Sequence, residues 1–258
     1  MSAAAVQQNG KVALVTGAAR GIGRGIALRL AADGYRVAVN HPSDDDGPDE
    51  TLRLIAEAGG EAVGVKADVG VAEQARGLVA EVVERLGRLD VVVCNAGICP
   101  FGPFDEVTEE TWDRTHEVNL KGTFLVSQEA SRVMIAQGDG GRIVAISSIS
   151  AIAGGSMQTA YTPTKAGQVS LMRSLAIALG PHGITCNCVE PGTILTDLNA
   201  EVLADPAMRE HYESRIPTRT IGTPADIAGA VAFLVSDDAA YVNGTEILVD
   251  GGALVNLA

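Results

Sequence analysis

A tyrosine and a lysine four residues apart, Tyr161 and Lys165, are the residues of this sequence best suited to proton transfer. On a helix they would lie on one face, within reach of each other. A protonated lysine beside a phenol favours the phenolate and lowers the pKa of the phenol, which can then take a proton from an alcohol. Pro163 lies between them and is tolerated only in the first turn of a helix, so we expect the helix to begin near this pair.

A serine hydroxyl precedes this pair along the chain. Ser148 follows an apolar run at 143–146 that predicts a strand, and open α/β sheets bind ligands at the carboxyl ends of their strands. The Ser148 hydroxyl could stabilise the oxygen of an alkoxide or a carbonyl. Each of these patterns alone is more often structural, so the interpretation as an active site depends on a further signal.

That signal is a glycine-rich turn, Thr-Gly-Ala-Ala-Arg-Gly-Ile-Gly at 16–23, between a predicted strand and a predicted helix. Gly17 would allow a tight turn, Gly21 would let backbone N–H groups approach a pyrophosphate, and Gly23 would let helix and strand pack closely. The helix N-terminus adds partial positive charge for the anion. The spacing and its context predict a dinucleotide site.

The end of the second predicted strand should carry the residue that reads the adenosine ribose. An acid there would select NAD, and an arginine would select NADP. The sequence instead has the neutral run Asn40-His41-Pro42, while Arg20 of the glycine turn could approach a 2′-phosphate. The acidic residues at 44–46 are expected to form a solvated loop. Both NAD and NADP therefore stay open.

Apolar runs predict seven strands, at 12–16, 36–40, 62–67, 91–94, 143–146, 185–189 and 247–249. Helical spacing predicts helices near 21–32, 49–58, 72–86, 109–137, 157–180 and 224–235. Because the elements alternate and the strands are nearly continuous runs of Val, Ile and Ala, we predict an α/β fold with a doubly wound parallel sheet. Residues 1–258 are expected to form a single domain, with a candidate lid at about 193–223.

Composition excludes several classes of protein. With 47% hydrophobic and 20% charged residues, the chain of 258 residues is typical of a globular domain rather than a disordered one. Aromatic residues make up 3%, too few for a surface that stacks on bases, and the net charge of −13 would repel nucleic acid and anionic membranes. We therefore expect neither a nucleic-acid nor a membrane partner.

The cysteines and the N-terminus predict a reduced, cytoplasmic protein. Cys94, Cys99, Cys186 and Cys188 form no Cys-x-x-Cys pair, so we expect reduced thiols and no metal site. The first residues lack the basic and apolar regions of a signal peptide. No apolar run approaches the roughly 18 residues that span a bilayer.

These motifs occur in the order typical of one family. The sequence resembles the short-chain dehydrogenase/reductase family over essentially its whole length, through the glycine turn at 16–23, Asp68-Val69, Asn95-Ala96-Gly97, Asn119, Ser148, Tyr161-x-x-x-Lys165 and Pro191-Gly192. The resemblance implies a seven-stranded Rossmann-like domain, a homotetramer, and NAD or NADP in an extended groove. Residues of about 10–100 would mainly bind the cofactor, and about 101–258 would carry the catalytic and substrate residues.

The resemblance also implies a role for each motif residue. Tyr161 would be the general acid/base, with Lys165 lowering its pKa and contacting the nicotinamide ribose. Ser148, thirteen residues before the tyrosine, matches the family's substrate-orienting serine better than Ser147 does. Asn119 would hold a water in a proton relay, a role compatible with an amide that is hydrogen-bonded to the backbone inside a helix. The residues expected at the cofactor are Gly17, Arg20, Gly21, Ile22, Gly23, Asn40, His41, Asp68, Val69, Asn95, Ala96, Gly97, Tyr161, Lys165, Pro191, Gly192, Ile194 and Thr196.

Three stretches, at 95–101, at 147–151 with 154–159, and at 250–257, are similar to a branch of the family that oxidises the anomeric hydroxyl of a 6-deoxyaldose to the lactone. L-Rhamnose is the expected sugar. Neutral hydrogen-bonding side chains suit a polyol, because a site built from them rejects analogues that lack a hydroxyl. The residues expected at the substrate are Ser148, Ser150, Gln158, Tyr161, Thr193 and Asn199.

Three alternatives stay open. A 3-oxoacyl-carrier-protein reductase would present basic residues beside its site to an acidic carrier, but where such enzymes have an arginine this sequence has Ile177. A non-catalytic dinucleotide sensor on the same fold would typically lose Tyr161 or Lys165, and both are present. A dehydrogenase or reductase of another sugar, steroid or small alcohol would share every motif given above.

Overall fold

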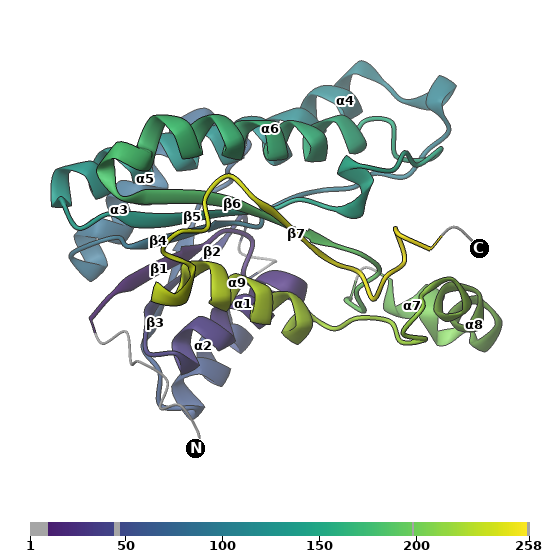
Figure 1. Ribbon diagram of the computed structural model, residues 1–258, viewed down its shortest axis with the longest axis horizontal. Helices are drawn as coiled ribbons and strands as arrows, with labels where there is room; N and C mark the ends of the chain where they lie inside the picture. The colour runs from purple at the N-terminus through teal and green to yellow at the C-terminus, as the bar shows by residue number, and fades with distance from the viewer. Residues whose placement is uncertain (1–9, 44–46, 198, 257–258) are drawn as a thin grey trace.

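A seven-stranded parallel sheet forms the centre of the protein, seen in a computed structural model that describes residues 10–43, 47–197 and 199–256. The strand order is β3-β2-β1-β4-β5-β6-β7 (Figure 1). The strands are β1 Val12–Val15, β2 Arg36–His41, β3 Ala62–Lys66, β4 Val91–Cys94, β5 Gly141–Ile146, β6 Ile184–Pro191 and β7 Glu246–Val249. All seven predicted strands are confirmed, each within two residues of its predicted ends, and so is the doubly wound parallel fold. The predicted acidic loop at 44–46 lies outside the described residues.

The strands are buried on both faces, as their continuous apolar sequences predict. In β1, Val12 and Leu14 face one hydrophobic core, while Ala13 and Val15 face the other. Helices cover each face (Figure 1). On one side lie α1 Gly21–Ala32, α2 Asp49–Glu57 and α9 Pro224–Val235; on the other lie α3 Ala72–Leu86, α5 Gly122–Gln137 and α6 Thr162–Leu179.

Two predicted helices differ from the structure. The helix expected at 109–137 is divided into α4 Glu109–His116, the π-helical turn η2 Glu117–Lys121, and α5. In this turn the carbonyl of Asn119 accepts hydrogen bonds from the side chains of Thr123 and Gln168, at 2.7 and 2.8 Å. The helix expected from 157 begins instead at Thr162, because residues 155–161 form turns closed by hydrogen bonds such as Gln158 N to Gly155 O.

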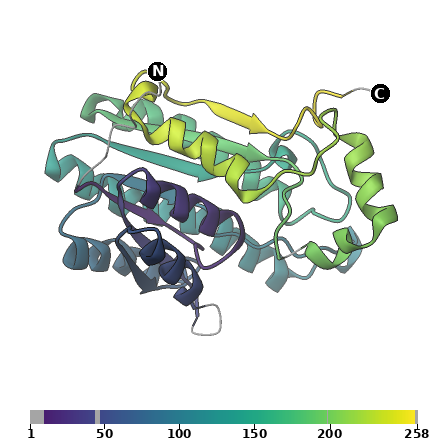
Figure 2. The same ribbon diagram turned by 90° about the horizontal axis from the view of Figure 1, so that it is seen from below.

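The candidate lid contains two short helices, α7 Ala200–Ala204 and α8 Pro206–Arg215. They lie beyond the carboxyl ends of the strands, at one end of the molecule (Figure 2). A small separate core of Leu203, Ile216 and Ile221 holds the segment together. Its motion stays a prediction.

The short 3₁₀ turns are η1 Phe104–Glu106, η3 Ile149–Ala151, η4 Gly180–His182 and η5 Asp237–Ala239.

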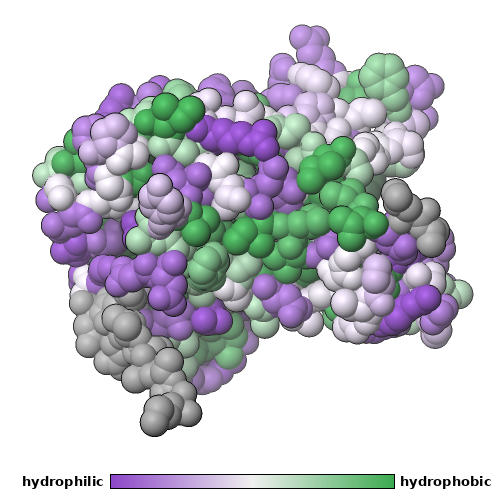
Figure 3. Space-filling view, in the orientation of Figure 1, coloured by the Kyte–Doolittle hydropathy of each residue, from purple (hydrophilic) through white to green (hydrophobic). Residues whose placement is uncertain are grey.

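Strand β7 forms one edge of the sheet. Hydrophobic side chains gather along this edge and over the chain beyond it (Figure 3). Unpaired edge strands and exposed apolar patches are surfaces that proteins commonly cover with a partner. Within the part of the chain described here, no helix has the length and apolar character needed to cross a membrane.

Candidate active site

Tyr161 and Lys165 lie at the start of α6, as Pro163 predicts. Tyr161 immediately precedes the helix and Pro163 occupies its first turn. The Lys165 Nζ lies 5.3 Å from the centroid of the Tyr161 ring and donates a hydrogen bond to the Ile146 carbonyl at 2.8 Å. The lysine is 4% exposed. Its ammonium is therefore fixed between the end of β5 and the phenol.

The electrostatics of this pair differ from the prediction. Burial raises the pKa of the Tyr161 phenol above its ordinary value, and the hydrogen bond with Ser148 only partly opposes that change. Burial also lowers the pKa of Lys165 to about 8. We expected the lysine to lower the tyrosine pKa; in the chain alone, desolvation is the larger effect because both groups lie in a low-dielectric interior.

The two serines after β5 have separate tasks. Ser147 is buried, and its hydroxyl donates to the Lys165 carbonyl at 3.0 Å, which ties the helix to the strand. Ser148 is half-buried; its hydroxyl accepts from the Ser150 N–H at 3.1 Å and is hydrogen-bonded with Tyr161. The geometry therefore favours Ser148 over Ser147 as the serine beside the reacting oxygen.

Asn119 lies inside the π-helical turn and is fully buried. Its Oδ1 accepts from the Ile98 N–H at 2.8 Å, and its Nδ2 donates to the Ile98 carbonyl at 2.9 Å and to the Thr164 hydroxyl at 3.1 Å. The side chain thus brackets the backbone of the loop that follows β4. Its role in holding a relay water stays a prediction.

Of the other predicted substrate residues, Ser150 and Gln158 are in contact, whereas Thr193 and Asn199 belong to another segment. The Ser150 hydroxyl donates to Gln158 Oε1 at 3.2 Å, close to Ser148. Thr193 and Asn199 lie on the segment after β6. The Asn199 amide is bonded within that segment, to the Ile194 carbonyl and the Thr196 N–H, both at 2.9 Å. A sugar contact by Asn199 would have to share these hydrogen bonds.

The glycine turn has the shape that its sequence predicts. Gly17 and Gly21 have φ angles of +63° and +55°, in the left-handed region that favours glycine. A Cβ on Gly23 would collide with the Gly17 carbonyl, so only glycine lets α1 approach the turn after β1 this closely. The Asn95 amide donates to the carbonyls of Thr16 and Gly17 at 2.9 and 3.1 Å and joins the turn to the end of β4.

The side chains at the end of β2 make more hydrogen bonds within the protein than we predicted. Asn40 is buried; its Oδ1 accepts from the Gly17 N–H at 3.2 Å, and its Nδ2 donates to the carbonyls of Val65 and Ala67. This amide supports the glycine turn rather than presenting free groups to a ribose. His41 Nδ1 lies 2.9 Å from the Ser43 carbonyl. Contacts of Asn40, His41 and the exposed Arg20 with a cofactor stay predictions.

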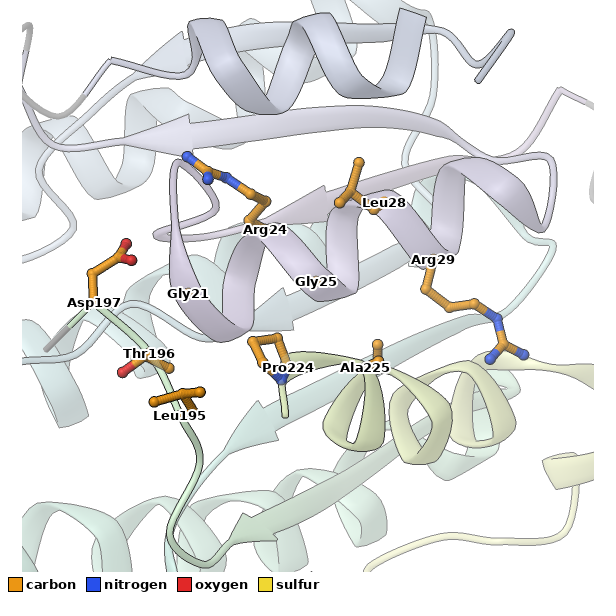
Figure 4. A pocket seen from close by; sticks show the side chains of 11 residues that line it. Gly21, Arg24, Gly25, Leu28, Arg29, Leu195, Thr196, Asp197, Pro224 and Ala225 are labelled. Atoms are coloured by element: carbon orange, nitrogen blue, oxygen red, sulfur yellow. The ribbon is translucent and has the colours of Figure 1, made fainter. Parts of the chain in front are cut away.

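A groove of about 600 Å³ lies beside the N-terminus of α1 (Figure 4). It brings Gly21 close to Thr196, since a Cβ on Gly21 would lie 3.6 Å from Thr196 Cγ2. Ile194 is buried next to Thr196 and bridges to Gly222. Two predicted cofactor segments, distant in sequence, are therefore neighbours. The groove is lined by Gly21, Arg24, Gly25, Leu28, Arg29, Leu195, Thr196, Asp197, Pro224, Ala225 and Ala228.

Sequence reasoning missed several supporting residues. Arg24 donates to the Ala19 carbonyl and to the Thr51 hydroxyl, which itself donates to the carbonyls of Ala18 and Ala19. Figure 4 shows the Arg24 side chain directed toward the turn that precedes α1. These bonds fix the glycine turn from outside, and no sequence motif marks them.

On the adenine side, Arg114 of α4 pairs with Asp68 at 2.6 Å. Asp68 also accepts from the Gly70 N–H at 2.9 Å. The carboxylate that the family resemblance assigns to the adenine lies in the loop after β3 and is therefore oriented by a helix residue 46 positions away. A long-range ion pair of this kind leaves no local signal in the sequence.

The cysteines are all free, and three of them, Cys94, Cys186 and Cys188, are buried in strands. Cys99 is half-buried, and its sulfur lies 3.5 Å from Gln158 Nε2. Across 10–43, 47–197 and 199–256, no three His, Cys, Asp or Glu side chains are arranged as metal ligands.

These features fit a dinucleotide. The α1 N-terminus presents backbone N–H groups beside a turn that has no room for a Cβ at Gly23, and the Tyr161–Lys165 pair lies at the carboxyl end of the same sheet. Residues 17–253 match the family described as enoyl-(acyl carrier protein) reductase. The chain belongs to the short-chain dehydrogenase/reductase family of oxidoreductases.

Particular members of the family are similar over nearly the whole chain. An L-rhamnose 1-dehydrogenase (NAD(P)(+)) of Sphingomonas sp. (strain SKA58) is 51% identical, covering 96% of this chain and 98% of the relative. A protein of the same name from Azotobacter vinelandii is also 51% identical, with the same coverage. A short-chain dehydrogenase of Burkholderia cenocepacia, solved in complex with NADP, is 38% identical with a TM-score of 0.88, covering 96% of this chain and 99% of that one.

Proposed function

We propose that the protein oxidises the anomeric hydroxyl of L-rhamnose to the lactone, with NAD or NADP as the hydride acceptor. The observation that carries this proposal is the placement of Tyr161, Lys165 and Ser148 together at the end of β5, on a chain 51% identical to proteins named for this activity. The family membership supplies the oxidoreductase class, and the identity to those relatives supports the sugar.

The site residues would divide between binding the cofactor and moving the proton of the substrate. The glycine turn and the N-terminus of α1 would hold the pyrophosphate, and Ile194 and Thr196 would hold the carboxamide. When bound, the cofactor supplies the acceptor for the hydride that leaves C1. Tyr161 takes the proton of the C1 hydroxyl, while Ser148 donates a hydrogen bond to the C1 oxygen. The C1–H and O–H bonds break, a C=O bond forms, and the lactone results.

Lys165 would act on this step through its charge. Two of its three N–H donors remain after the bond to Ile146, enough to reach a ribose hydroxyl and the phenol. Burial lowers its pKa to about 8, so near pH 7 most of the lysine still carries its proton. A positive charge held there would favour the phenolate against the effect of burial.

The substrate side suits a polyol. Ser148, Ser150 and Gln158 are neutral and form one hydrogen-bonded row, joined by bonds of 3.1 and 3.2 Å. Such a row would leave polar groups unpaired if a sugar lacked the matching hydroxyls. A carrier-protein substrate has less support, because Ile177, which is 82% exposed, replaces the arginine expected of those reductases.

We also propose the homotetramer that the family resemblance implies. The position of β7 at the edge of the sheet and the hydrophobic surface beside it support this proposal (Figure 3). Residues of about 10–100 would mainly bind the cofactor, and about 101–258 would carry the catalytic and substrate residues. The neutral end of β2 supports the use of both NAD and NADP.

The test is the initial rate of NAD(P)H formation with L-rhamnose, L-fucose, L-lyxose, L-mannose, D-glucose and a secondary alcohol, each with NAD and with NADP. We expect a preference for L-rhamnose and its close stereoisomers in kcat/KM. No reaction with any sugar, but oxidation of the secondary alcohol, would overturn the aldose proposal and leave a general alcohol dehydrogenase.

A further inference from the structure

The thiol of Cys99 contacts the amide of Gln158 beside the predicted substrate residues, with Gln158 Nε2 3.5 Å from the sulfur. We propose that Cys99 is a positioning residue: it fixes the orientation of the Gln158 amide, which then reads two neighbouring hydroxyls of the sugar. This inference rests on the proposed function and assigns part of its specificity to a residue that would not itself touch the reacting atoms.

The side-chain amide of Gln158 makes two of the four hydrogen bonds that it can form. Its Oε1 accepts from the Ser150 hydroxyl at 3.2 Å, and its Nε2 donates to Cys99. A glutamine amide offers two lone pairs and two N–H groups, so one acceptor site and one donor stay available. Since the two existing bonds lie on opposite ends of the amide, they define which end accepts and which donates. A vicinal diol can satisfy both at once.

The position of Cys99 is itself fixed from the protein interior. The residue before it, Ile98, is bonded at both its N–H and its carbonyl to the buried Asn119 side chain. Further along the same loop, Gly102 N donates to the Met157 carbonyl at 3.1 Å, which joins the loop to the segment that carries Gln158. The thiol is therefore held by a braced backbone.

The amide is fixed relative to the catalytic tyrosine as well. The Gln158 carbonyl accepts from the N–H groups of Tyr161 and Thr162, both at 2.9 Å. On the other side, Ser150 is joined to Ser148. Gly155 leaves the space that the amide occupies, because a Cβ there would lie 2.5 Å from Gln158 Oε1. Because the backbone of Gln158 is fixed relative to Tyr161, rotating its side-chain amide would exchange the donor and the acceptor that face the sugar.

The chemistry of the thiol suits a hydrogen-bond partner rather than a nucleophile. Burial raises the pKa of Cys99, which keeps the group neutral near pH 7. A neutral sulfur accepts a hydrogen bond weakly, so its loss should cost the few-fold effect of one neutral hydrogen bond and leave the fold intact.

The experiment is a double-mutant cycle with Cys99→Ala and Gln158→Ala, measured as KM and kcat for L-rhamnose at saturating cofactor. We expect Cys99→Ala to raise KM about 3- to 10-fold with kcat within about twofold, and Cys99→Ser to restore most of the loss. In the Gln158→Ala background the Cys99→Ala change should have little further effect. Ile152→Ala, which removes a side chain 60% exposed after η3, serves as the control and should leave KM within about twofold.

Additive effects of the two substitutions would overturn the inference while leaving the proposed function in place. A second readout needs no activity: the rate of alkylation of Cys99 by iodoacetamide, followed by mass spectrometry. We expect this rate to rise severalfold in Gln158→Ala, because removing the side chain uncovers the half-buried thiol and relieves the burial that raises its pKa. Equal alkylation rates in the wild type and in Gln158→Ala would show that the two side chains are not coupled, whichever substrate the enzyme oxidises.

Discussion

The glycine turn at 16–23 and the substrate-side loops at 95–104 and 147–160 are held in place by different means. In the turn the backbone itself is packed tightly: a Cβ on Gly17 would lie 2.9 Å from the Ala96 Cα, and one on Gly23 would meet the Gly17 carbonyl. On the substrate side, side chains brace the loops, through Asn119 and Gln158.

This difference separates two kinds of requirement. The turn requires a residue without a side chain, so a substitution there should damage the fold and cofactor binding together. The substrate side requires particular hydrogen-bond partners, so a substitution there should change specificity before stability. Substitutions in the two regions should therefore separate loss of stability from loss of specificity.

The largest effect is expected at Tyr161, which directly follows the substrate-side loop at 147–160. Tyr161→Phe keeps the ring but removes the proton acceptor, so kcat should fall by a factor of about 10² to 10⁴. The cofactor affinity, measured by fluorescence titration, should stay within about twofold because the glycine turn is unchanged. A variant with near wild-type kcat would remove Tyr161 from the acid/base role.

A smaller but still large effect is expected from a single methyl group in the turn. Gly23→Ala should lower the free energy of unfolding by about 3 kcal/mol and weaken cofactor binding, because the new Cβ forces α1 away from the Gly17 carbonyl of the turn. Gly77→Ala is the matched control: a Cβ on Gly77 in α3 meets nothing within 4 Å, so it should be neutral or stabilise by up to about 1 kcal/mol. Equal urea midpoints for the two variants would contradict this account of the turn.

The smallest effect concerns a buried carboxyl group that lacks hydrogen-bond partners like those of the Asn119 and Gln158 side chains. Glu190 in β6 is fully buried, and neither of its side-chain oxygens has a hydrogen-bond partner among the described residues. Burial, reinforced by the charge of Glu246 and partly offset by Arg173, raises its pKa to about 7. The protonated form therefore suits the folded state better than the ionised form does.

Because the folded pKa lies above the unfolded value, the stabilising contribution is fully present below about pH 4.5 and is lost as the pH rises through about 7. Relative to Glu190→Gln, which cannot ionise, the wild type should lose roughly 2–3 kcal/mol over this range. Urea unfolding at pH 5 and pH 8 measures the difference. Parallel changes in the two proteins would show that Glu190 does not titrate in this window.

The same comparison explains what could be predicted from the sequence. The strands and the glycine turn follow from residue types that a local geometry demands, so β1, α1 and the roles of Gly17 and Gly23 were predictable. The arrangement of Tyr161 and Lys165 was predictable because both belong to one helix and Pro163 marks its start. The effect of burial on their pKa values was not, since it depends on the packing of the whole fold.

The rest depends on contacts between distant positions. Gln158 and Cys99 are 59 residues apart, and Asn119 and Ile98 are 21 apart, so no local spacing joins them. From the sequence, Asn40 is a candidate ribose contact at the end of β2. In the structure, its side-chain amide is hydrogen-bonded to backbone groups of the glycine turn and of the chain at 65–67. The helix expected at 109–137 has no residue that marks its interruption, because a π-helical turn uses the same residue types as an α-helix.

That turn, Glu117–Lys121, makes the length of this segment as important as its composition. A π-helical turn amounts to one extra residue in an α-helix, and each residue of an α-helix advances the side-chain direction by about 100°. Deleting a single residue between α4 and α5 would restore the regular helix but rotate Asn119 away from Ile98 or α5 away from its core. Insertions and deletions here should therefore be rarer in evolution than substitutions, and a redesign of the substrate loops has to preserve the residue count of this helix.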